Sequence, residues 1–409
     1  MASEVSRTPR QFPRWSELRP LLRLKTPELN PSRRRLGKAL TIEDLRRVAR
    51  RRTPRSVFDY TDGAAEGEVS LGRARAAFES VEFCPRVLHD VSTVDPTTSM
   101  LGAPASVPFA FAPTGFTRMM HHEGETAVAR VADRRGIPYA LSTLGTTSIE
   151  LVAEAAPEAR KWFQLYVQKD RSVGEDLMAR ATDAGYEALI LTVDAPVPGA
   201  RLRDVRNGFA IPPALTLRTV ADAARHPAWW INLLTTEPLT FATFTTWEGT
   251  VAELMTTLLD PTMTLDDLEW LRSHWSGPLL VKGIQTVSDA TAVVDAGADG
   301  VVLSNHGGRQ LDRAPAPLRL VPDVRDAIGD RADVVVDTGI MSGADIVAAV
   351  AAGAHYTLVG RAYLYGLMAG GERGVDRAAD ILDTEVRRTM ALLGAASISE
   401  LQPHHVRID

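Results

Sequence analysis

The chain has 409 residues, of which 45% are apolar and 24% charged, with a formal net charge of −5 and one cysteine, Cys84. These fractions exclude a largely disordered or collagen-like chain, and the length suffices for one large barrel or about two to three small domains. One cysteine excludes an intrachain disulfide and favours a reducing compartment. No stretch approaches the roughly 18 apolar residues of a membrane-spanning helix. The N-terminus also lacks a signal-peptide pattern, so we expect a cytoplasmic protein.

Charge is unevenly distributed along the chain. Residues 1–55 hold 16 Lys and Arg against 5 Asp and Glu, a net of +11, whereas the remainder carries −16. Residues 1–40, with five prolines among the arginines, are predicted to form an extended basic arm rather than a domain. Because the aromatic residues of the arm are only Phe12 and Trp15, nucleic-acid binding is not expected. We expect the arm to cover the acidic body or a neighbouring subunit.

From residue 41 onward the pattern predicts one α/β domain. Thr41 begins a helix through a capping box with Asp44, and beyond residue 100 short apolar runs alternate with amphipathic helical segments. The predicted strands are 108–113, 138–142, 161–167, 188–193, 279–282, 300–304, 333–337 and 356–360. Eight such units in about 270 residues predict a (β/α)8 TIM barrel over 41–409 with an N-terminal helical extension. An open α/β sheet is the alternative.

Helix ends are clearest in the second half of the chain. Helices are predicted at 286–296 and 342–352, and Gly297 and Gly353 terminate them. Both helices follow predicted strands, as a repeated β/α unit requires.

Strands four and five are separated by an unusually long segment. Between Asp194 and Leu279 lie 84 residues, so we predict an insertion of approximately residues 203–265 after strand four. It contains an apolar run around Trp229 and Trp230. Loops after barrel strands grow on the catalytic face, so the insertion is either a lid or docking surface, or an inert structural hairpin.

Polar residues collect where the predicted strands end, which is the catalytic face of a barrel. Lys282 follows an apolar run, and a cation in that position requires an anionic or electron-rich partner. Gly339 and Gly360, with Arg361, match the usual phosphate site of a barrel, although tight turns alone would explain the two glycines.

His306 is the most informative residue of this face. Its imidazole can act as a base near neutral pH. Gly307 and Gly308, which follow, let a ligand approach the backbone, and Arg309 supplies a cation that can bind a carboxylate. The pairs His121-His122 and His404-His405 lack a third ligand at suitable spacing, so no metal site is predicted. The chain has no strand-associated Gly-x-Gly-x-x-Gly and no Walker sequence, which disfavours a nicotinamide site and a P-loop.

The stretch Ser304-Asn-His-Gly-Gly-Arg-Gln-Leu-Asp312 resembles the active-site segment of the FMN-dependent α-hydroxy acid dehydrogenase/oxidase family, which includes glycolate oxidase and mandelate dehydrogenase. The resemblance extends from about Thr41 to the C-terminus. Its further motifs are Phe58-Asp-Tyr60, Ala112-Pro-Thr-Gly115, Gln164-Leu-Tyr166, Thr192-Val-Asp194, Leu280-Val-Lys-Gly283 and Gly360-Arg361. With its basic arm, the chain is most similar to the FMN-dependent L-lactate dehydrogenases of actinobacteria.

This resemblance implies FMN as the cofactor and a role for each matching residue. The implied cofactor contacts are Pro113, Thr114, Gly115, Ser142, Gln164, Thr192, Lys282, Ser304, Asp337, Gly339, Gly360 and Arg361. The implied catalytic residues are His306, Asp194, Tyr166, Arg309, Tyr60 and Lys282, and the implied substrate contacts are Tyr60, Tyr166, Arg201, His306 and Arg309. In this scheme His306 is the general base, Asp194 orients it, and Lys282 stabilises the reduced flavin.

The implied activity is oxidation of an L-2-hydroxy acid, lactate first, to the 2-oxo acid, with electrons passed to a quinone or a cytochrome. Three points stay open: an oxidase or monooxygenase that uses O2 on a glycolate- or mandelate-like substrate; a non-redox FMN barrel isomerase; and hydride against carbanion chemistry. The resemblance also implies a homotetramer. The arm and the insertion together suggest peripheral contact with the inner face of a membrane.

Three positions depart from the family pattern. Met341 stands where many members have an arginine, so Arg361 is expected to carry more of the phosphate charge. Gly115 stands where several oxidases have alanine, and Leu144 stands where some members have a bulky tryptophan. The size of the substrate pocket is therefore open.

Overall fold

The computed structural model describes residues 11–22, 28–208, 217–244 and 259–408. The chain divides into two compact units, Met1–Lys38 and Ala39–Asp409. The described part of the first unit is not fully extended, because it contains α1 (Trp15–Leu18), a 3-10 turn η1 (Arg19–Leu21) and α2 (Pro31–Leu36). Asn30 caps α2 by accepting hydrogen bonds from the backbone of Ser32 and Arg33.

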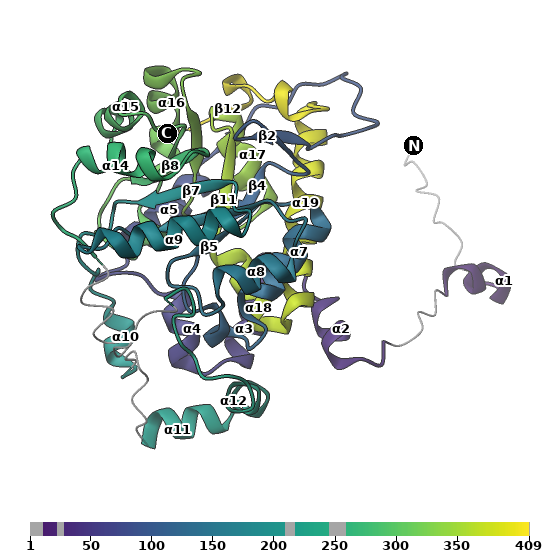
Figure 1. Ribbon diagram of the computed structural model, residues 1–409. Coiled ribbons are helices and arrows are strands. Elements are labelled where there is room, and N and C mark those ends of the chain that lie inside the picture. Colours follow the sequence, from purple (N-terminus) through teal and green to yellow (C-terminus); the bar gives the residue numbers. More distant parts are fainter. Residues whose placement is uncertain (1–10, 23–27, 209–216, 245–258, 409) are drawn as a thin grey trace. The chain divides into compact units, whose positions relative to one another are not determined.

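Eight parallel strands form a closed barrel in the second unit (Figure 1). They are β4 (Phe109–Phe111), β5 (Tyr139–Ser142), β6 (Lys161–Leu165), β7 (Ala188–Thr192), β8 (Leu279–Ile284), β9 (Gly300–Leu303), β10 (Asp333–Val336) and β11 (Tyr356–Val359). Each strand pairs with its neighbours in chain order, and β11 closes the barrel against β4. The predicted (β/α)8 barrel is confirmed, and the open sheet is excluded.

Helices surround the barrel, as the amphipathic segments between strands predict. They are α7 (Gly124–Arg135), α8 (Ile149–Ala155), α9 (Arg171–Asp183), α14 (Asp266–His274), α15 (Val287–Asp295), α16 (Pro317–Ile328), α17 (Gly343–Ala351), α18 (Arg361–Gly370) and α19 (Glu372–Leu393). Helices α15 and α17 confirm the two predicted helices, and Thr286 and Ser342 cap them. A separate two-stranded sheet pairs β1 (Glu82–Phe83) with β12 (Val406–Arg407). Two 3-10 turns, η3 (Ile398–Glu400) and η4 (Pro403–His405), precede β12 in the chain.

The hairpin of β2 (Thr98–Met100) and β3 (Ala103–Ala105) closes the end of the barrel where the strands begin. The backbone N–H of Leu101 donates to the carboxylate of Asp333, the first residue of β10. Met100 is fully buried among the residues that fill the barrel. The opposite end, where the strands finish, is therefore the one left for a site.

Three helices of the N-terminal extension lie over that opposite end: α3 (Ile42–Arg52), α4 (Arg55–Asp62) and α5 (Val69–Glu79). The predicted capping box at the start of α3 is confirmed, because Thr41 and Asp44 cap each other's backbone. The carboxylate of Asp312, beyond β9, accepts hydrogen bonds from the backbone of Gly67 and Ser70. The extension is thus fastened to the segment that carries the His306 motif.

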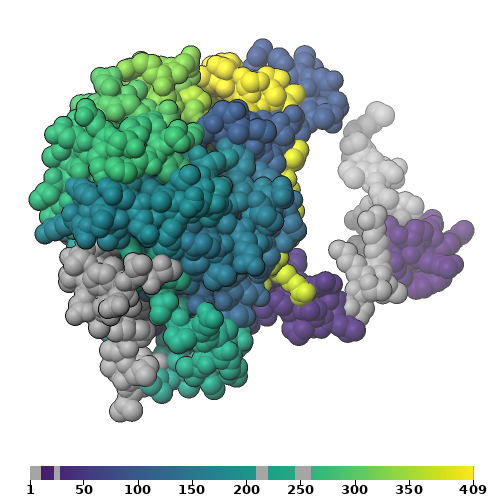
Figure 2. Space-filling model, in the orientation of Figure 1, coloured from purple at the N-terminus to yellow at the C-terminus, as the bar shows by residue number. Residues whose placement is uncertain are grey.

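The segment after β7 contains α10 (Leu202–Arg206), α11 (Leu217–Ala224) and α12 (Pro227–Leu234), before α14 resumes the barrel. The indole N–H of Trp229 donates to the carbonyl of Met119, on α6 (Thr117–Met120), at 2.8 Å. Helix α12 reaches the surface (teal in Figure 2), where Ile231 is 45% and Leu234 74% exposed. In the described parts of the chain, no helix is both long and apolar enough to cross a membrane.

Candidate active site

A cavity of about 680 Å³ opens at the end of the barrel where the strands finish, and every strand or the segment that follows it contributes to its wall. The structure brings the following predicted residues to this wall: Tyr60, Pro113, Thr114, Gly115, Ser142, Gln164, Tyr166, Thr192, Arg201, Lys282, His306, Arg309, Asp337, Gly339, Gly360 and Arg361. Asp194 and Ser304 are predicted site residues that lie behind the wall.

His306 and Asp194 form a hydrogen-bonded pair. His306 Nδ1 lies 3.1 Å from Asp194 Oδ1, and only 2% of the Asp194 side chain is exposed. Burial raises the pKa of Asp194, but the neighbouring His306 and Lys282 outweigh burial and leave the pKa below its usual value. An ionised carboxylate accepts the Nδ1–H, so Nε2 is the ring nitrogen that remains for a substrate.

The turn η2 (His306–Gly308) holds the imidazole at the cavity. His306 has φ 58° and Gly307 φ 66°, a left-handed pair that favours glycine at the second position. The Asn305 side chain accepts from the backbone of Gly308 at 2.9 Å and donates to the carbonyl of Pro315 at 3.1 Å. Local hydrogen bonds therefore maintain a backbone conformation that histidine rarely adopts.

Lys282 is buried in the wall between two acceptors. Its Nζ lies 2.9 Å from Asp337 Oδ2 and donates to Ser304 Oγ at 3.0 Å. Burial lowers the pKa of Lys282, but the carboxylates of Asp337 and Asp194 outweigh it and leave the pKa raised. The cation therefore has the anionic partner that the sequence argument required.

Ser304 does not line the cavity, and its predicted contact with the cofactor stays a prediction. Its side chain is fully buried, and its hydroxyl accepts hydrogen bonds from Lys282 Nζ and, at 2.9 Å, from the backbone of His306. Ser304 is the first residue after strand β9, and it is absent from the cavity wall. In the structure Ser304 supports both Lys282 and His306 rather than lining the cavity.

Tyr60, Arg201 and Arg309 gather at one place on the wall. The guanidinium carbons of Arg201 and Arg309 lie 5.5 Å and 4.8 Å from the centre of the Tyr60 ring. Burial and the nearby cations Arg201 and Arg361 lower the pKa of Arg309 to about 10. Two guanidinium groups that share so little space favour an anion between them.

Tyr166 lines the same region. Burial, reinforced by the charge of Asp194, raises the pKa of its phenol above the usual value. The phenol therefore stays protonated near neutral pH and can donate a hydrogen bond into the cavity.

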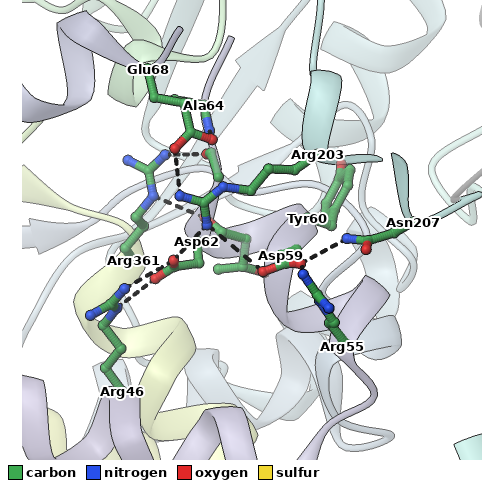
Figure 3. A network of polar contacts seen from close by, with 12 residues as sticks. Arg46, Arg55, Asp59, Tyr60, Asp62, Ala64, Glu68, Arg203, Asn207 and Arg361 are labelled. Carbon is green, nitrogen blue, oxygen red and sulfur yellow. Dashed lines mark hydrogen bonds and ion pairs between the residues drawn. The ribbon is translucent and has the colours of Figure 1, made fainter. Parts of the chain in front are cut away.

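A charged network joins α10 to α4 beside these residues, and the sequence argument did not find it (Figure 3). The buried Asp62 carboxylate accepts from Arg203 Nη1 at 3.0 Å, from Arg46 Nη2 at 3.0 Å and from the Tyr365 hydroxyl at 2.8 Å. Burial raises the pKa of Asp62, but Arg46, Tyr365 and Arg203 together leave it lowered. Arg203 follows Arg201 by two residues, so the network fixes the segment that carries Arg201.

Gln310 is a second residue that the sequence argument missed. Its Nε2 donates to the carbonyls of Asp194 at 3.2 Å and Val197 at 3.0 Å, and its Oε1 accepts from the backbone of Gly199 at 3.1 Å. One amide therefore holds the loop that runs from Asp194 to Arg201 against the His306 segment.

Gly115 and Leu144, two of the positions that depart from the family pattern, are neighbours in the cavity wall. A Cβ added at Gly115 would lie 2.8 Å from the Leu144 Cβ. An alanine at position 115 would therefore displace Leu144, so the two positions are sterically coupled.

The His121-His122 pair has a third potential ligand after all. Ligand atoms of His121, His122 and Glu123 lie within 4.8 Å of one another. Burial lowers the pKa of His121 to about 3, so its imidazole is neutral near pH 7. No metal site was predicted at this pair because a third ligand at suitable spacing was not expected; that reason is wrong, because Glu123 directly follows His122.

Comparison with known proteins places the chain in a family. Residues 49–408 match the family model described as FMN-dependent dehydrogenase. A Mycobacterium tuberculosis protein named "Putative L-lactate dehydrogenase" is 59% identical over 397 residues, which cover 97% of this chain and 96% of that protein. The L-lactate dehydrogenase of Caulobacter vibrioides is 43% identical over 88% of this chain and 95% of its own.

Solved structures agree with this placement. A crystal structure of the monotopic membrane protein (S)-mandelate dehydrogenase superposes with a TM-score of 0.88 at 37% identity, over 91% of this chain and 100% of its own. A crystal structure of mandelate oxidase superposes with a TM-score of 0.79 at 38% identity, over 91% and 99%. The resemblance inferred from the sequence motifs is confirmed, and this chain belongs to the FMN-dependent dehydrogenase family.

Proposed function

We propose that the protein oxidises an L-2-hydroxy acid to the 2-oxo acid, with lactate as the favoured substrate, FMN as cofactor and His306 as general base. The observation that carries this proposal is the His306–Asp194 pair, whose imidazole lines the same cavity as the guanidinium groups of Arg201 and Arg309. A base beside a site for a carboxylate is what a 2-hydroxy acid requires.

The polar groups of the wall fit a flavin. Gln164 Nε2 and Thr192 Oγ1 are buried and have no hydrogen-bond partner among the described residues, although both residues line the cavity. The Gln164 Oε1 accepts from Ser142 Oγ at 3.0 Å, which fixes the orientation of the amide. Unpaired buried polar groups are costly, and the polar edge of a flavin would satisfy them. Lys282 would add a cation beside the ring.

FMN held in this cavity would accept the hydrogen of the substrate α-carbon together with its two bonding electrons. Arg201 and Arg309 bind the substrate carboxylate and orient the α-carbon. His306 Nε2 takes the proton of the substrate hydroxyl, and the Asp194 carboxylate stabilises the imidazolium that forms. The Tyr166 phenol, which stays protonated, donates a hydrogen bond to the oxygen that becomes the carbonyl.

Anaerobic mixing with a panel of L- and D-2-hydroxy acids tests the reaction, with bleaching of the flavin absorbance as the readout. We expect L-lactate and other small L-acids to bleach the flavin and the D-acids to leave it oxidised. No bleaching by any 2-hydroxy acid would contradict the proposal and favour a non-redox reaction. Glycolate and mandelate are included in the panel because Leu144, in place of a bulky tryptophan, leaves open how large a substrate side chain the pocket accepts.

The electron acceptor is proposed to be a quinone or a cytochrome, because relatives are named dehydrogenases. Reoxidation of the reduced flavin by a quinone analogue but slowly by air is the expected outcome. Fast reoxidation by air would instead indicate an oxidase, and one neighbour in structure is a mandelate oxidase.

We propose peripheral contact with a membrane through α12, since a neighbour in structure is a monotopic membrane protein and Ile231 and Leu234 are exposed. Flotation with anionic liposomes should recover the wild type, and Ile231→Ser with Leu234→Ser should abolish recovery. Leu392→Ser is the matched control, because Leu392 on α19 is 72% exposed. Equal flotation of both variants would contradict this contact.

A homotetramer and a cytoplasmic location remain predictions, which light scattering and cell fractionation would test.

A further inference from the structure

Arg75, on α5, lines the same cavity and touches the turn that follows β10. Its Nη1 donates to the carbonyl of Gly339 and lies 2.7 Å from Asp345 Oδ2. The arginine is separated from Gly339 by 264 positions, so no motif connects the two residues. Its side chain is 28% exposed, which places it at the rim of the cavity.

A second guanidinium, that of Arg361 on α18, lies beside a neighbour of this turn. The hydroxyl of Thr338 accepts from the backbone of Gly307 at 3.0 Å, and a Cβ added at Gly307 would lie 2.6 Å from Arg361 Nη1. Arg361 uses Nε and Nη2 for the carbonyls of Thr61 and Gly63, at 2.9 Å and 2.8 Å. Arg75 therefore contacts the turn directly, whereas Arg361 lies beside Gly307, which is hydrogen-bonded to the turn.

The phosphate of FMN carries a charge of about −1.5 to −2 near neutral pH, so one guanidinium does not neutralise it. A second cation beside Arg361 would bring the local charge closer to balance.

Three backbone donors at the start of α17, next to the same turn, are already used. The backbone of Gly343 donates to Glu385 at 2.8 Å, that of Asp345 to Ser342 at 3.1 Å, and that of Met341 to Asp345 at 2.8 Å. Carboxylates and a hydroxyl thus occupy three of the donors that would otherwise bind an anion. A side-chain cation would add to the donors that remain.

We propose that Arg75 is this second cation and holds the FMN phosphate together with Arg361. Both hydrogen bonds of Arg75 use Nη1, whereas Nη2 makes only an ion pair with the exposed Glu79, 3.7 Å from its Oε1. Because an exposed ion pair of this length is weak, Nη2 can donate to a phosphate oxygen instead, and Asp345 holds the guanidinium in place. The inference rests on the proposed phosphate position at Gly339, Gly360 and Arg361.

Titration of the full-length, flavin-free chain with FMN and with riboflavin tests the proposal, with quenching of flavin fluorescence as the readout. Riboflavin lacks the phosphate, so a phosphate contact changes only the FMN dissociation constant. We expect Arg75→Gln to weaken FMN by about tenfold or more, roughly 1.4 kcal/mol, and to leave riboflavin unchanged within about twofold. Arg73→Gln is the matched control, because Arg73 lies on the same helix, is exposed and does not line the cavity.

Equal weakening of FMN and riboflavin by Arg75→Gln would show that Arg75 only holds the loop, and would overturn the proposal. No weakening of either flavin would overturn it too. Arg361→Gln tests the proposed phosphate position independently of Arg75. If the phosphate lies at this turn, Arg361→Gln should weaken the binding of FMN and leave that of riboflavin unchanged. If circular dichroism shows that Arg75→Gln does not fold, Arg75→Lys replaces it. For Arg75→Lys we expect the preference for FMN over riboflavin to be smaller than in the wild type but not lost.

Discussion

Two parts of the cavity wall are built in different ways. The floor consists of side chains at the ends of strands: Ser142, Gln164, Thr192, Lys282 and Asp337. Strand register sets their neighbours, since Ser142 pairs with Gln164 and Thr192 with Lys282 across adjacent strands. The barrel therefore holds the floor in place.

The roof consists of Tyr60, Arg201, Arg203 and Arg309, which lie outside the barrel strands, and of Gln310, which supports it without lining the cavity. Its contacts join distant parts of the chain: Arg203 to Asp62 across 141 positions and Arg309 to the carbonyl of Tyr60 across 249. A few ion pairs and one amide thus hold the groups proposed to bind the substrate. Changes in the roof should alter substrate use and leave the cofactor site intact, whereas changes in the floor, and in the Asp62 network that anchors the roof, should cost stability.

The largest expected effect is in the floor. Lys282→Met leaves the carboxylates of Asp337 and Asp194 buried without their cation, and we expect a loss of about 3–5 kcal/mol in the free energy of unfolding. Denaturant unfolding of the flavin-free chain measures it without a contribution from cofactor binding.

Lys161→Met is the matched control for that measurement. Lys161 is equally buried, but its Nζ donates to the carbonyls of Ala156, Pro157 and Ala159. Because no carboxylate is stranded, the loss should be smaller. Equal losses in the two variants would mean that the floor cation has no special part in stability.

The next effect is at the base of the roof. Asp62→Asn removes the charge that Arg46, Arg203 and Tyr365 share, and we expect a loss of about 2 kcal/mol, moderated because both arginines are partly exposed. The folded-state pKa of Asp62 is lowered, so its contribution is complete above the unfolded value of about 3.9 and is lost as the pH falls through the folded value. Thermal unfolding at pH 7 and near pH 3.5 should show the deficit of the variant shrinking in acid; a deficit that grows in acid would contradict the ion-pair account.

A smaller effect is expected from Gln310→Glu, which keeps the shape and replaces the donor facing the carbonyls of Asp194 and Val197. We expect kcat/KM for the 2-hydroxy acid to fall by about five- to tenfold, roughly 1–1.4 kcal/mol, with unchanged FMN content. Gln402→Glu is the control, because the exposed Gln402 also donates to a carbonyl, that of Ser399. Loss of FMN from Gln310→Glu would contradict the claim that changes in the roof leave the cofactor site intact.

The smallest effect is expected from Asp222→Asn on α11. Its carboxylate accepts the backbone N–H of Arg55, the first residue of α4, at 2.7 Å, in an exposed position. Exposed contacts of this kind are worth less than about 1 kcal/mol, so kcat/KM should change by less than about twofold. A tenfold change would show that α11, rather than the network around Asp62, controls the roof.

The floor could be predicted from the sequence because strand ends are visible as polar residues after apolar runs. The Lys282 environment, the barrel and the capped helices all follow from local patterns of this kind. Tyr60 and Arg201 were expected only through the family resemblance, since nothing in their local sequence marks them. Their proposed roles, like those of the other site residues, remain predictions.

Asp62, Arg75, Arg203 and Gln310 were missed because their partners lie far away in the chain. No spacing rule relates Arg203 to Asp62 or Gln310 to Gly199. Ser304 was expected at the cofactor because it belongs to the motif, and in the structure its buried hydroxyl accepts hydrogen bonds from Lys282 and from the backbone of His306. The predicted insertion, approximately 203–265, includes residues 209–216 and 245–258, which lie outside the described residues.

The central claim is that His306 removes the proton of the substrate hydroxyl. Stopped-flow reduction of bound FMN by L-lactate under anaerobic conditions tests it most directly, in the wild type, in His306→Ala and in His404→Ala, which changes an exposed histidine outside the cavity. We predict that His306→Ala keeps its FMN and slows flavin reduction by about 10²- to 10⁴-fold, whereas His404→Ala matches the wild type. Reduction in His306→Ala within about tenfold of the wild-type rate, roughly 1.4 kcal/mol, would contradict the claim.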